Sequence, residues 1–199
     1  NTTGVNAAAY ASGGTMLGGS RALILEGVTS TFGRTAEFEI ANGAFGSNGL
    51  GTKSRAAAVY GATGISSPSG NSWFVSLNNS INLSGLTGFQ FDWLGSDKTV
   101  DLVVAARTFN GFTFDQKTWK LAVPASGPGT IGLGAAQVIG DTGLDPTQID
   151  HLFFYVDSTT TADAADWGMS KFSAVVPEPA SMAVLGIGLA ALKRRRRNG

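Results

Sequence analysis

Apolar and polar side chains alternate along several short stretches in the first three quarters of the chain. The alternation covers residues 35–40, 73–77, 89–93, 100–104 and 119–123. A period of two places successive side chains on opposite faces of an extended backbone, which is typical of half-buried strands. In residues 89–93, for example, Phe89, Phe91 and Trp93 share one face, and Gln90 and Asp92 share the other. The pattern predicts strands in which each aromatic residue points toward a core.

Other stretches extend this prediction without strict alternation. Residues 152–156 are apolar on both faces and predict a central strand that is covered on both sides. Residues 172–176 predict the closing strand, and residues 23–27, 56–60 and 81–84 predict further strands. Glycine, proline, serine and asparagine separate these runs, and no stretch before residue 177 has a helical period. Eight to ten short strands in a chain with 28 glycines predict an all-β fold, an antiparallel β-sandwich.

Residues 1–20 consist mainly of glycine, alanine, serine and threonine with little periodicity. They predict a loose lead-in that could contribute one edge strand. We therefore expect three parts: the lead-in at 1–20, a β-sandwich domain at 21–176, and a separate C-terminal segment at 177–199.

The C-terminal segment contains three elements without a gap. It begins with Pro177, Glu178 and Pro179, continues as an apolar run over residues 180–192, and ends in a basic block. The basic block consists of Lys193, Arg194, Arg195, Arg196 and Arg197. The prolines stop a preceding strand, and the uncharged run predicts a hydrophobic helix about 20 Å long at ~1.5 Å per residue. That is shorter than a ~30 Å hydrocarbon core, so the helix spans it only if the arginine side chains extend toward the interface and the bilayer thins locally.

The basic block favours a membrane segment over the two alternatives. A buried helix of the domain would carry five cations at its end, and a nucleic-acid patch would leave the apolar run unexplained. Lysine and arginine favour the cytoplasmic side, so the block would act as a stop-transfer signal and leave the body outside.

Charge and cysteine content describe the body more closely. Residues 1–176 contain nine basic and thirteen acidic residues, a net charge of −4, which argues against nucleic acid or anionic lipid as partners of the body. The chain has no cysteine, so an exported body must be stabilised by its core alone. The sequence starts at Asn1 without a signal peptide, and we expect an export signal to have been removed or to lie outside this sequence.

The order Pro177-Glu178-Pro179, hydrophobic span and arginine cluster resembles the PEP-CTERM sorting signal of Gram-negative bacteria. The resemblance covers residues 177–197. It implies an exported protein whose tail is processed by an exosortase, a membrane transpeptidase-like enzyme, in a bacterium that makes extracellular polysaccharide.

The strand order of the body resembles the jelly-roll sandwiches of galactose-binding and carbohydrate-binding modules. Such domains often have an Asp-Asn pair in the last strand that is tied to a structural calcium. That pair aligns here with Ser170 and Lys171, so the resemblance does not carry this calcium site over.

Three groups of residues could in principle support catalysis or metal binding. His151 is the one histidine, so a Ser-His-Asp triad would need it, but Asp150 points to the opposite strand face. Glu37 and Glu39 share a strand face and could be imagined as a glycosidase pair, although solvated acids fit better. A calcium site at Asp157, Asp163 and Asp166 competes with a solvated acidic loop, which we favour because the spacing matches no EF-hand.

Two glycine patterns and four tryptophans complete the candidates. Residues 46–54 nearly form a P-loop and residues 127–132 match G-x-G-x-x-G, but neither is predicted to join a strand to a helix. Trp73, Trp93 and Trp119 fall on apolar strand faces and are predicted to be core. Trp167, at a junction between loop and strand, is the best candidate for stacking on a sugar.

Together these observations predict a jelly-roll β-sandwich with a C-terminal hydrophobic helix. We expect a non-enzymatic protein, sorted by an exosortase to the cell surface or the extracellular polysaccharide matrix of a biofilm. The alternatives are a carbohydrate-binding module for that polysaccharide and a self-assembling structural subunit. No catalytic residue, metal or cofactor is predicted. The expected partners are the exosortase, the membrane before processing, and extracellular polysaccharide, without nucleic acid; the sequence leaves the oligomeric state open.

Overall fold

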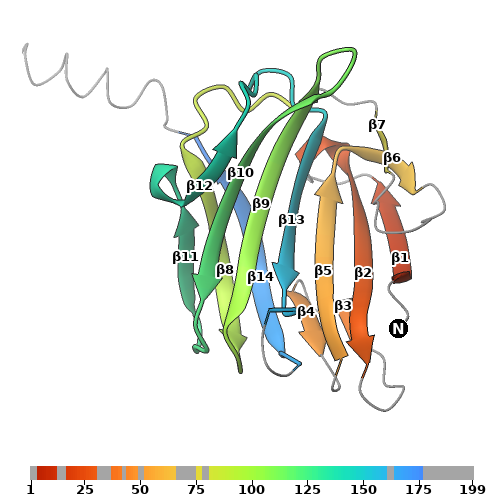
Figure 1. Cartoon of the computed structure of the whole chain (residues 1–199), viewed down its shortest axis with the longest axis vertical. Helices are drawn as coiled ribbons and strands as arrows, with labels where there is room; N and C mark the ends of the chain where they lie inside the picture. The colour runs from red at the N-terminus through yellow and green to blue at the C-terminus, as the bar shows by residue number, and fades with distance from the viewer. Residues whose placement is uncertain are drawn as a thin grey trace, which may run out of the picture.

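Two antiparallel sheets packed face to face form the body of the chain (Figure 1). The structure is a computed structural model that describes residues 4–12, 17–30, 37–41, 44–48, 52–65, 75–77, 81–160 and 164–176. Within these ranges the chain forms fourteen strands and two short 3₁₀ helices, η1 (Leu17–Gly19) and η2 (Ala135–Gln137).

The larger sheet contains seven strands. Their spatial order is β1 (Gly4–Ser12), β2 (Ser20–Ser30), β5 (Thr52–Tyr60), β13 (His151–Asp157), β9 (Val100–Phe109), β10 (Phe114–Val123) and β12 (Val138–Asp141). The smaller sheet has the order β11 (Gly129–Leu133), β8 (Gly88–Ser96), β14 (Trp167–Val175), β4 (Ala44–Asn48) and β3 (Glu37–Ala41). A separate hairpin pairs β6 (Ala62–Ile65) with β7 (Val75–Leu77).

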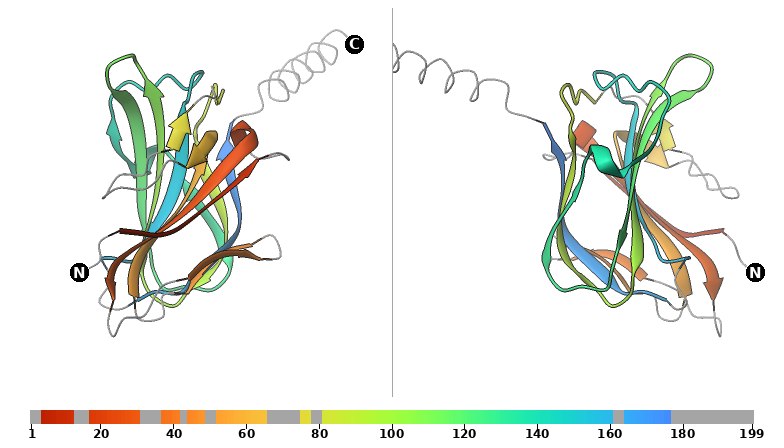
Figure 2. Two further views of the ribbon diagram at one scale, coloured as in Figure 1. Left: turned by 90° about the vertical axis from the view of Figure 1, so that its right-hand side faces the viewer. Right: turned by 60° about the vertical axis from the view of Figure 1, so that its left-hand side comes forward.

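The chain passes repeatedly between the two sheets, which makes the sandwich a jelly roll. β2 and β5 lie in the larger sheet, whereas β3 and β4, which connect them, lie in the smaller one. The last two strands enter the middle of both sheets: β13 lies between β5 and β9, and β14 lies between β4 and β8. The two sheets and their connections are seen from the side in Figure 2. The predicted antiparallel jelly-roll sandwich is therefore confirmed.

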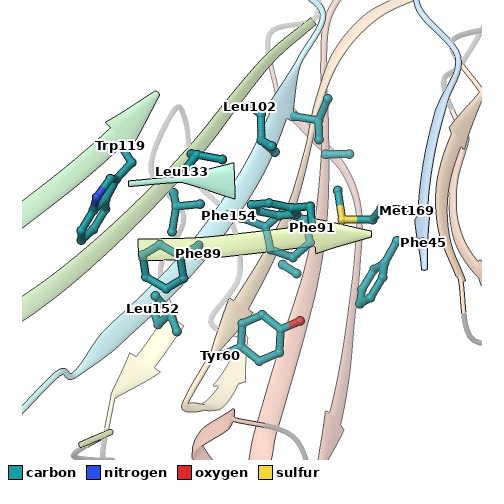
Figure 3. Packing of buried hydrophobic residues seen from close by; sticks show 14 of the residues in the cluster. Phe45, Tyr60, Phe89, Phe91, Leu102, Trp119, Leu133, Leu152, Phe154 and Met169 are labelled. Carbon is teal, nitrogen blue, oxygen red and sulfur yellow. The ribbon is translucent and has the colours of Figure 1, made fainter. Parts of the chain in front are cut away.

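The core lies between the sheets and is rich in aromatic rings (Figure 3). Phe91 of β8 and Phe154 of β13 meet edge to face across the sandwich, with ring centroids 5.4 Å apart. Phe89 contacts Trp119 in the same geometry at 5.0 Å. Phe89, Phe91 and Trp93 are all buried, as the alternation along β8 predicts. Contacts of this kind stabilise a domain that has no disulfide.

β13 is the central strand that its doubly apolar sequence predicts. Leu152, Phe154 and Val156 point into the sandwich. Phe153 lies on the outer face of the sheet, yet it is also buried, in a second cluster with small side chains such as Ala57 and Ala105. Small residues on β2, β5 and β9 let this outer cluster pack closely.

Two strand predictions need correction. The described residues contain fourteen strands rather than eight to ten, because segments with few large apolar residues, such as β1 and β11, also pair with neighbours. Residues 81–84 form no strand of their own, and only Ile81 makes an isolated bridge, to Ile149. The lead-in does contribute an edge strand, since β1 pairs with β2 along its length.

Several sequence predictions fall outside the described residues. These are Trp73, the motif Pro177-Glu178-Pro179, the hydrophobic helix at 180–192 and the basic block at 193–197. Among the helices in the described ranges, none is long and apolar enough to cross a membrane.

Candidate functional site

The point where the sorting segment leaves the domain is fixed by the last strand. β14 ends at Val175, whose carbonyl accepts hydrogen bonds from the backbone N–H (2.9 Å) and the hydroxyl (3.0 Å) of Thr87. Val176 alone then separates this anchored strand end from Pro177. The predicted sorting residues thus begin directly at the edge of the folded domain.

A second candidate site lies on the outer face of the seven-stranded sheet. Strand register places Asp157 of β13 opposite Arg55 of β5 on one side and Asp101 of β9 on the other. Tyr155 precedes Asp157 by two residues and so shares its face. Lys120 of β10 reaches Asp101 from the far side. We call Arg55, Asp101, Lys120, Tyr155 and Asp157 the Tyr155 cluster.

Two ion pairs neutralise the carboxylates of this cluster. Arg55 Nε lies 2.8 Å from Asp157 Oδ2, and Lys120 Nζ lies 2.8 Å from Asp101 Oδ2. The second oxygen of Asp157 accepts hydrogen bonds from the N–H and the hydroxyl of Thr159. Two carboxylates directly opposite one another would repel, and the flanking cations offset this repulsion.

The cluster perturbs the ionisation of its own side chains. Burial raises the pKa of the Tyr155 phenol, and the nearby carboxylate of Asp157 raises it further. The hydrogen bond to Asp101 raises the pKa of the Lys120 ammonium. Both shifts favour the protonated form, so Tyr155 presents a phenol hydroxyl and Lys120 an ammonium group at neutral pH.

The outer face continues from Tyr155 to Phe153 and Arg107. The two aromatic rings stack at 6.4 Å between centroids, and the Arg107 guanidinium lies 4.9 Å from the Phe153 centroid. Arg107 Nε also donates a hydrogen bond to Gln116 Oε1 at 3.1 Å. Phe153 is buried, Tyr155 is half-buried and Lys120 is exposed. The polar atoms around the phenol include both donors and acceptors, a combination that suits a hydroxyl-rich ligand.

His151 occupies the first position of β13 and does not form a triad with Asp150. Its ring stacks on Phe114 with centroids 5.4 Å apart. The Asp150 carboxylate instead accepts a hydrogen bond from the backbone N–H of Phe109 at 2.7 Å. The structure thus gives both residues local packing and hydrogen-bonding roles.

Both glycine-rich patterns lie in strand contexts, as the sequence predicts. Residues 46–48 belong to β4 and residues 52–54 belong to β5, with Lys53 inside β5. Residues 127–132 run into β11, which pairs with β8. Neither pattern opens a helix, so neither presents helical N–H groups to a phosphate.

The structure describes two of the three acids predicted for the polar loop, Asp157 and Asp166. The carboxylate of Asp157 pairs with Arg55, whereas the backbone N–H of Asp166 donates to Asp97 Oδ1 at 2.7 Å. Asp163 lies outside the described residues, and no group of three metal-ligating side chains occurs in the part of the chain that the structure describes. Glu37 and Glu39 lie on the edge strand β3. Ser170 and Lys171 lie at an irregularity in β14, where the Ser170 hydroxyl donates to the carbonyl of Asp92.

The tryptophans give one confirmation and one correction. Trp93 and Trp119 are buried, as predicted. Trp167 is also buried and stacks on Trp93, with centroids 5.9 Å apart and planes 8° from parallel, so its role as a sugar-stacking surface residue is wrong. The Tyr155 cluster was missed, although the period of two along residues 151–157 already places Tyr155 and Asp157 on one face.

Comparisons with known proteins support the sorting signal. The model of the PEP-CTERM protein-sorting motif matches residues 175–197, starting at the last residue of β14. No curated protein sequence matches the chain significantly. Two similar structures are family 11 carbohydrate-binding modules from Clostridium thermocellum. The first, in complex with a beta-1,3-1,4-mixed-linked tetrasaccharide, has a TM-score of 0.41 and 12% identity over 88% of this chain and 85% of that one.

The second structure is the module of the cellulosomal cellulase Lic26A-Cel5E, with the same TM-score of 0.41 and 12% identity over 90% of this chain and 86% of that one. Scores at this level are too low for the ligand of those modules to bear on this chain.

The chain carries a PEP-CTERM sorting motif, which marks it as an exported protein that is transiently anchored in the membrane before exosortase processing and delivery to the cell surface.

Proposed function

We propose that the chain is a non-catalytic protein that an exosortase processes. Processing delivers it either to the cell surface or to the extracellular polysaccharide matrix of a biofilm. The observation that carries the proposal is the position of the motif match, which begins where β14 ends. The segment removed by processing would then contribute nothing to the folded sandwich. Release would leave the folded sandwich as the mature surface domain.

Processing in cells tests this proposal. The full chain is expressed in a host that has an exosortase and in the same host without it. We expect a shortened body in the matrix fraction of the first host and an unprocessed chain in the membranes of the second. Processing that does not depend on the exosortase would contradict the proposal.

A second function, recognition of the polysaccharide itself, is supported by the Tyr155 cluster. A half-buried phenol between two ion pairs combines an apolar ring with donors and acceptors on a rigid central strand. Sugars offer the complementary features, because their rings have apolar faces and hydroxyl edges. The body is also acidic, so a neutral polysaccharide suits it better than a polyanionic one.

Affinity electrophoresis of the body in gels containing the host polysaccharide tests this second function. We expect Tyr155→Ala to weaken retardation by about tenfold, equivalent to about 1.4 kcal/mol. Phe112→Ser is the matched control, since Phe112 is an exposed aromatic residue outside the cluster, and it should leave retardation unchanged. Equal retardation of wild type and Tyr155→Ala would exclude the Tyr155 cluster as the binding site.

The third hypothesis is self-assembly. β1 is the terminal strand in the order of the larger sheet, and terminal strands can pair with another chain. Light scattering of the purified body tests this hypothesis. If the body assembles through β1, its measured mass should increase with protein concentration. Deletion of residues 1–12 should return the mass to the monomer value.

A further inference from the structure

Three phenylalanines are exposed at the turn between β9 and β10. Phe112 is 94% exposed, Phe109 is 51% exposed and Phe114 is 39% exposed. Single exposed apolar residues are ordinary on a protein surface, but three within six residues concentrate apolar side chains at one turn. We call residues 109–114 the phenylalanine hairpin.

The turn holds Phe112 outward in a defined conformation. Asn110 Oδ1 accepts the backbone N–H groups of Phe112 (3.1 Å) and Thr113 (2.9 Å), and Asn110 N donates to the Thr113 carbonyl (3.0 Å). Gly111 has a φ of +94°, which favours glycine. Phe109 and Phe114 contact each other below the tip at 5.3 Å. The exposed ring thus projects from a hydrogen-bonded turn on a stable ladder.

The phenylalanine hairpin and the sorting segment lie at the same end of the sandwich. Residues 97–99 join the end of β8 to the start of β9, so Gly88 and Phe109 both lie at the end opposite this connection. Val175 pairs with Gly88 and therefore lies at that end too. Figures 1 and 2 show the green tip of the β9–β10 hairpin and the blue end of β14 both toward the top.

The length of the connection brings this end of the domain close to the membrane. Only residues 176–179 separate Val175 from the apolar run that begins at Ala180. Four residues span at most about 14 Å when fully extended, at ~3.3–3.6 Å each. While the apolar run is in the bilayer, the end of the sandwich that bears the phenylalanine hairpin must stay near the lipid surface.

We propose that the phenylalanine hairpin inserts into the headgroup region of the bilayer while the sorting segment is anchored. The inference rests on the proposed membrane-anchored precursor. Insertion of aromatic rings at the interface is favourable, because they bring apolar surface out of water. The contact would fix the orientation of the domain as the exosortase approaches the residues beyond Val176.

The charges near the tip favour a zwitterionic lipid surface. Asp115 accepts from Asn110, Asp150 accepts from Phe109, and Asp141 pairs with Lys117. The carboxylates of Asp115 and Asp150 would be repelled by a strongly anionic surface, whereas the Asp141–Lys117 pair has no net charge. The contact is therefore expected to depend on apolar area and to weaken as the fraction of anionic lipid rises.

Site-specific labelling of the full chain tests the proposal. The chain has no cysteine, so Thr113→Cys places one environment-sensitive fluorophore beside Phe112 and leaves all three phenylalanines in place. Ala125→Cys labels the loop at the opposite end of the sandwich as a control. Both labelled chains are reconstituted in phosphatidylcholine vesicles, with and without Phe112→Ser, and recovered by flotation.

We expect the label at position 113 to shift to the blue and to be quenched by lipids with a shallow quencher. Phe112→Ser should abolish both effects, and the label at position 125 should show neither. A chain that does not float overturns the anchored precursor and the contact together. If the chain floats but its position-113 label stays in water, the contact alone is overturned. The contact is also overturned if the label is shielded equally in lipid-free chains, because a second copy or another protein would then cover the hairpin.

Discussion

Replacing Trp93 tests whether the aromatic core of β8 determines the stability of the domain. Trp93 is only 2% exposed and stacks on Trp167. Truncation of a buried tryptophan to alanine typically lowers the free energy of unfolding by about 3–5 kcal/mol. In a domain of this size, each kcal/mol of lost stability lowers the melting temperature by about 2–4 °C. We therefore expect Trp93→Ala to lower the melting temperature by about 6–20 °C.

The indole N–H makes a second substitution informative. Trp93 Nε1 is buried and makes no hydrogen bond within the described part of the chain. An unsatisfied buried donor costs about 1–3 kcal/mol, so Trp93→Phe removes this penalty while it loses some packing. We expect Trp93→Phe to destabilise the domain by less than half as much as Trp93→Ala.

Urea denaturation of residues 1–176, followed by circular dichroism, measures these changes without relying on tryptophan fluorescence. Asp92→Ala is the control. Its side chain points away from the core, and Gln90 Nε2, its hydrogen-bond donor, lies 3.4 Å from Oδ1, so we expect a change within about 0.5 kcal/mol. A loss below about 1 kcal/mol for Trp93→Ala would refute the assignment of Trp93 to the core. Equal losses for alanine and phenylalanine would refute the argument from the unpaired N–H.

Three further predictions concern the tail, metal binding and pH. Replacing arginines 194–197 with serine should reduce retention of the precursor in membranes, because these charges resist translocation; fractionation of cells measures this, and unchanged retention would remove the support for the orientation. The body should unfold cooperatively with the same midpoint in chelator and in calcium, because the acids of the 157–166 loop match no EF-hand spacing and we favour a solvated loop; calorimetry that shows a large decrease in chelator would reveal a calcium site in this loop. Burial raises the pKa of Tyr60 above its ordinary value of 10.0, so the stability that this phenol supports is present below pH 10 and decreases as the pH rises further. Tyr60→Phe should flatten this alkaline decrease in unfolding titrations, and an unchanged slope would contradict the assignment.

The sequence predicted the strands in which large apolar residues alternate with polar ones. In β8 the aromatic residues at 89, 91 and 93 face inward because nothing interrupts the period of two. β14 behaves differently. Trp167 and Met169 face the core, but an irregularity between Met169 and Lys171 changes the phase, and Phe172 and Ala174 then pack inward. A period of two cannot reveal such a bulge, because it depends on the pairing with β8.

Other features depended on contacts between distant strands. The sequence shows only a turn signal at residues 127–129, yet residues 129–133 form β11 because β8 offers them an edge. The Tyr155 cluster combines side chains from β5, β9, β10 and β13, so only the strand order brings them together. The phenylalanine hairpin had a local signal, the Asn110-Gly111 turn, but its proximity to the end of β14 follows from the topology alone.

The central positions of β13 and β14 affect when the domain can fold. Each sheet remains in two separate parts until its central strand arrives, since β13 joins β5 to β9 and β14 joins β4 to β8. These strands come last in the chain, and pairings between residues about a hundred positions apart form slowly. A chain that crosses a membrane from its N-terminus would therefore stay incomplete and unfolded until β14 emerges. Because the sorting motif follows β14 directly, the sandwich can close only when the C-terminal segment has reached the membrane, so completion of the fold and arrival of the signal would coincide in time.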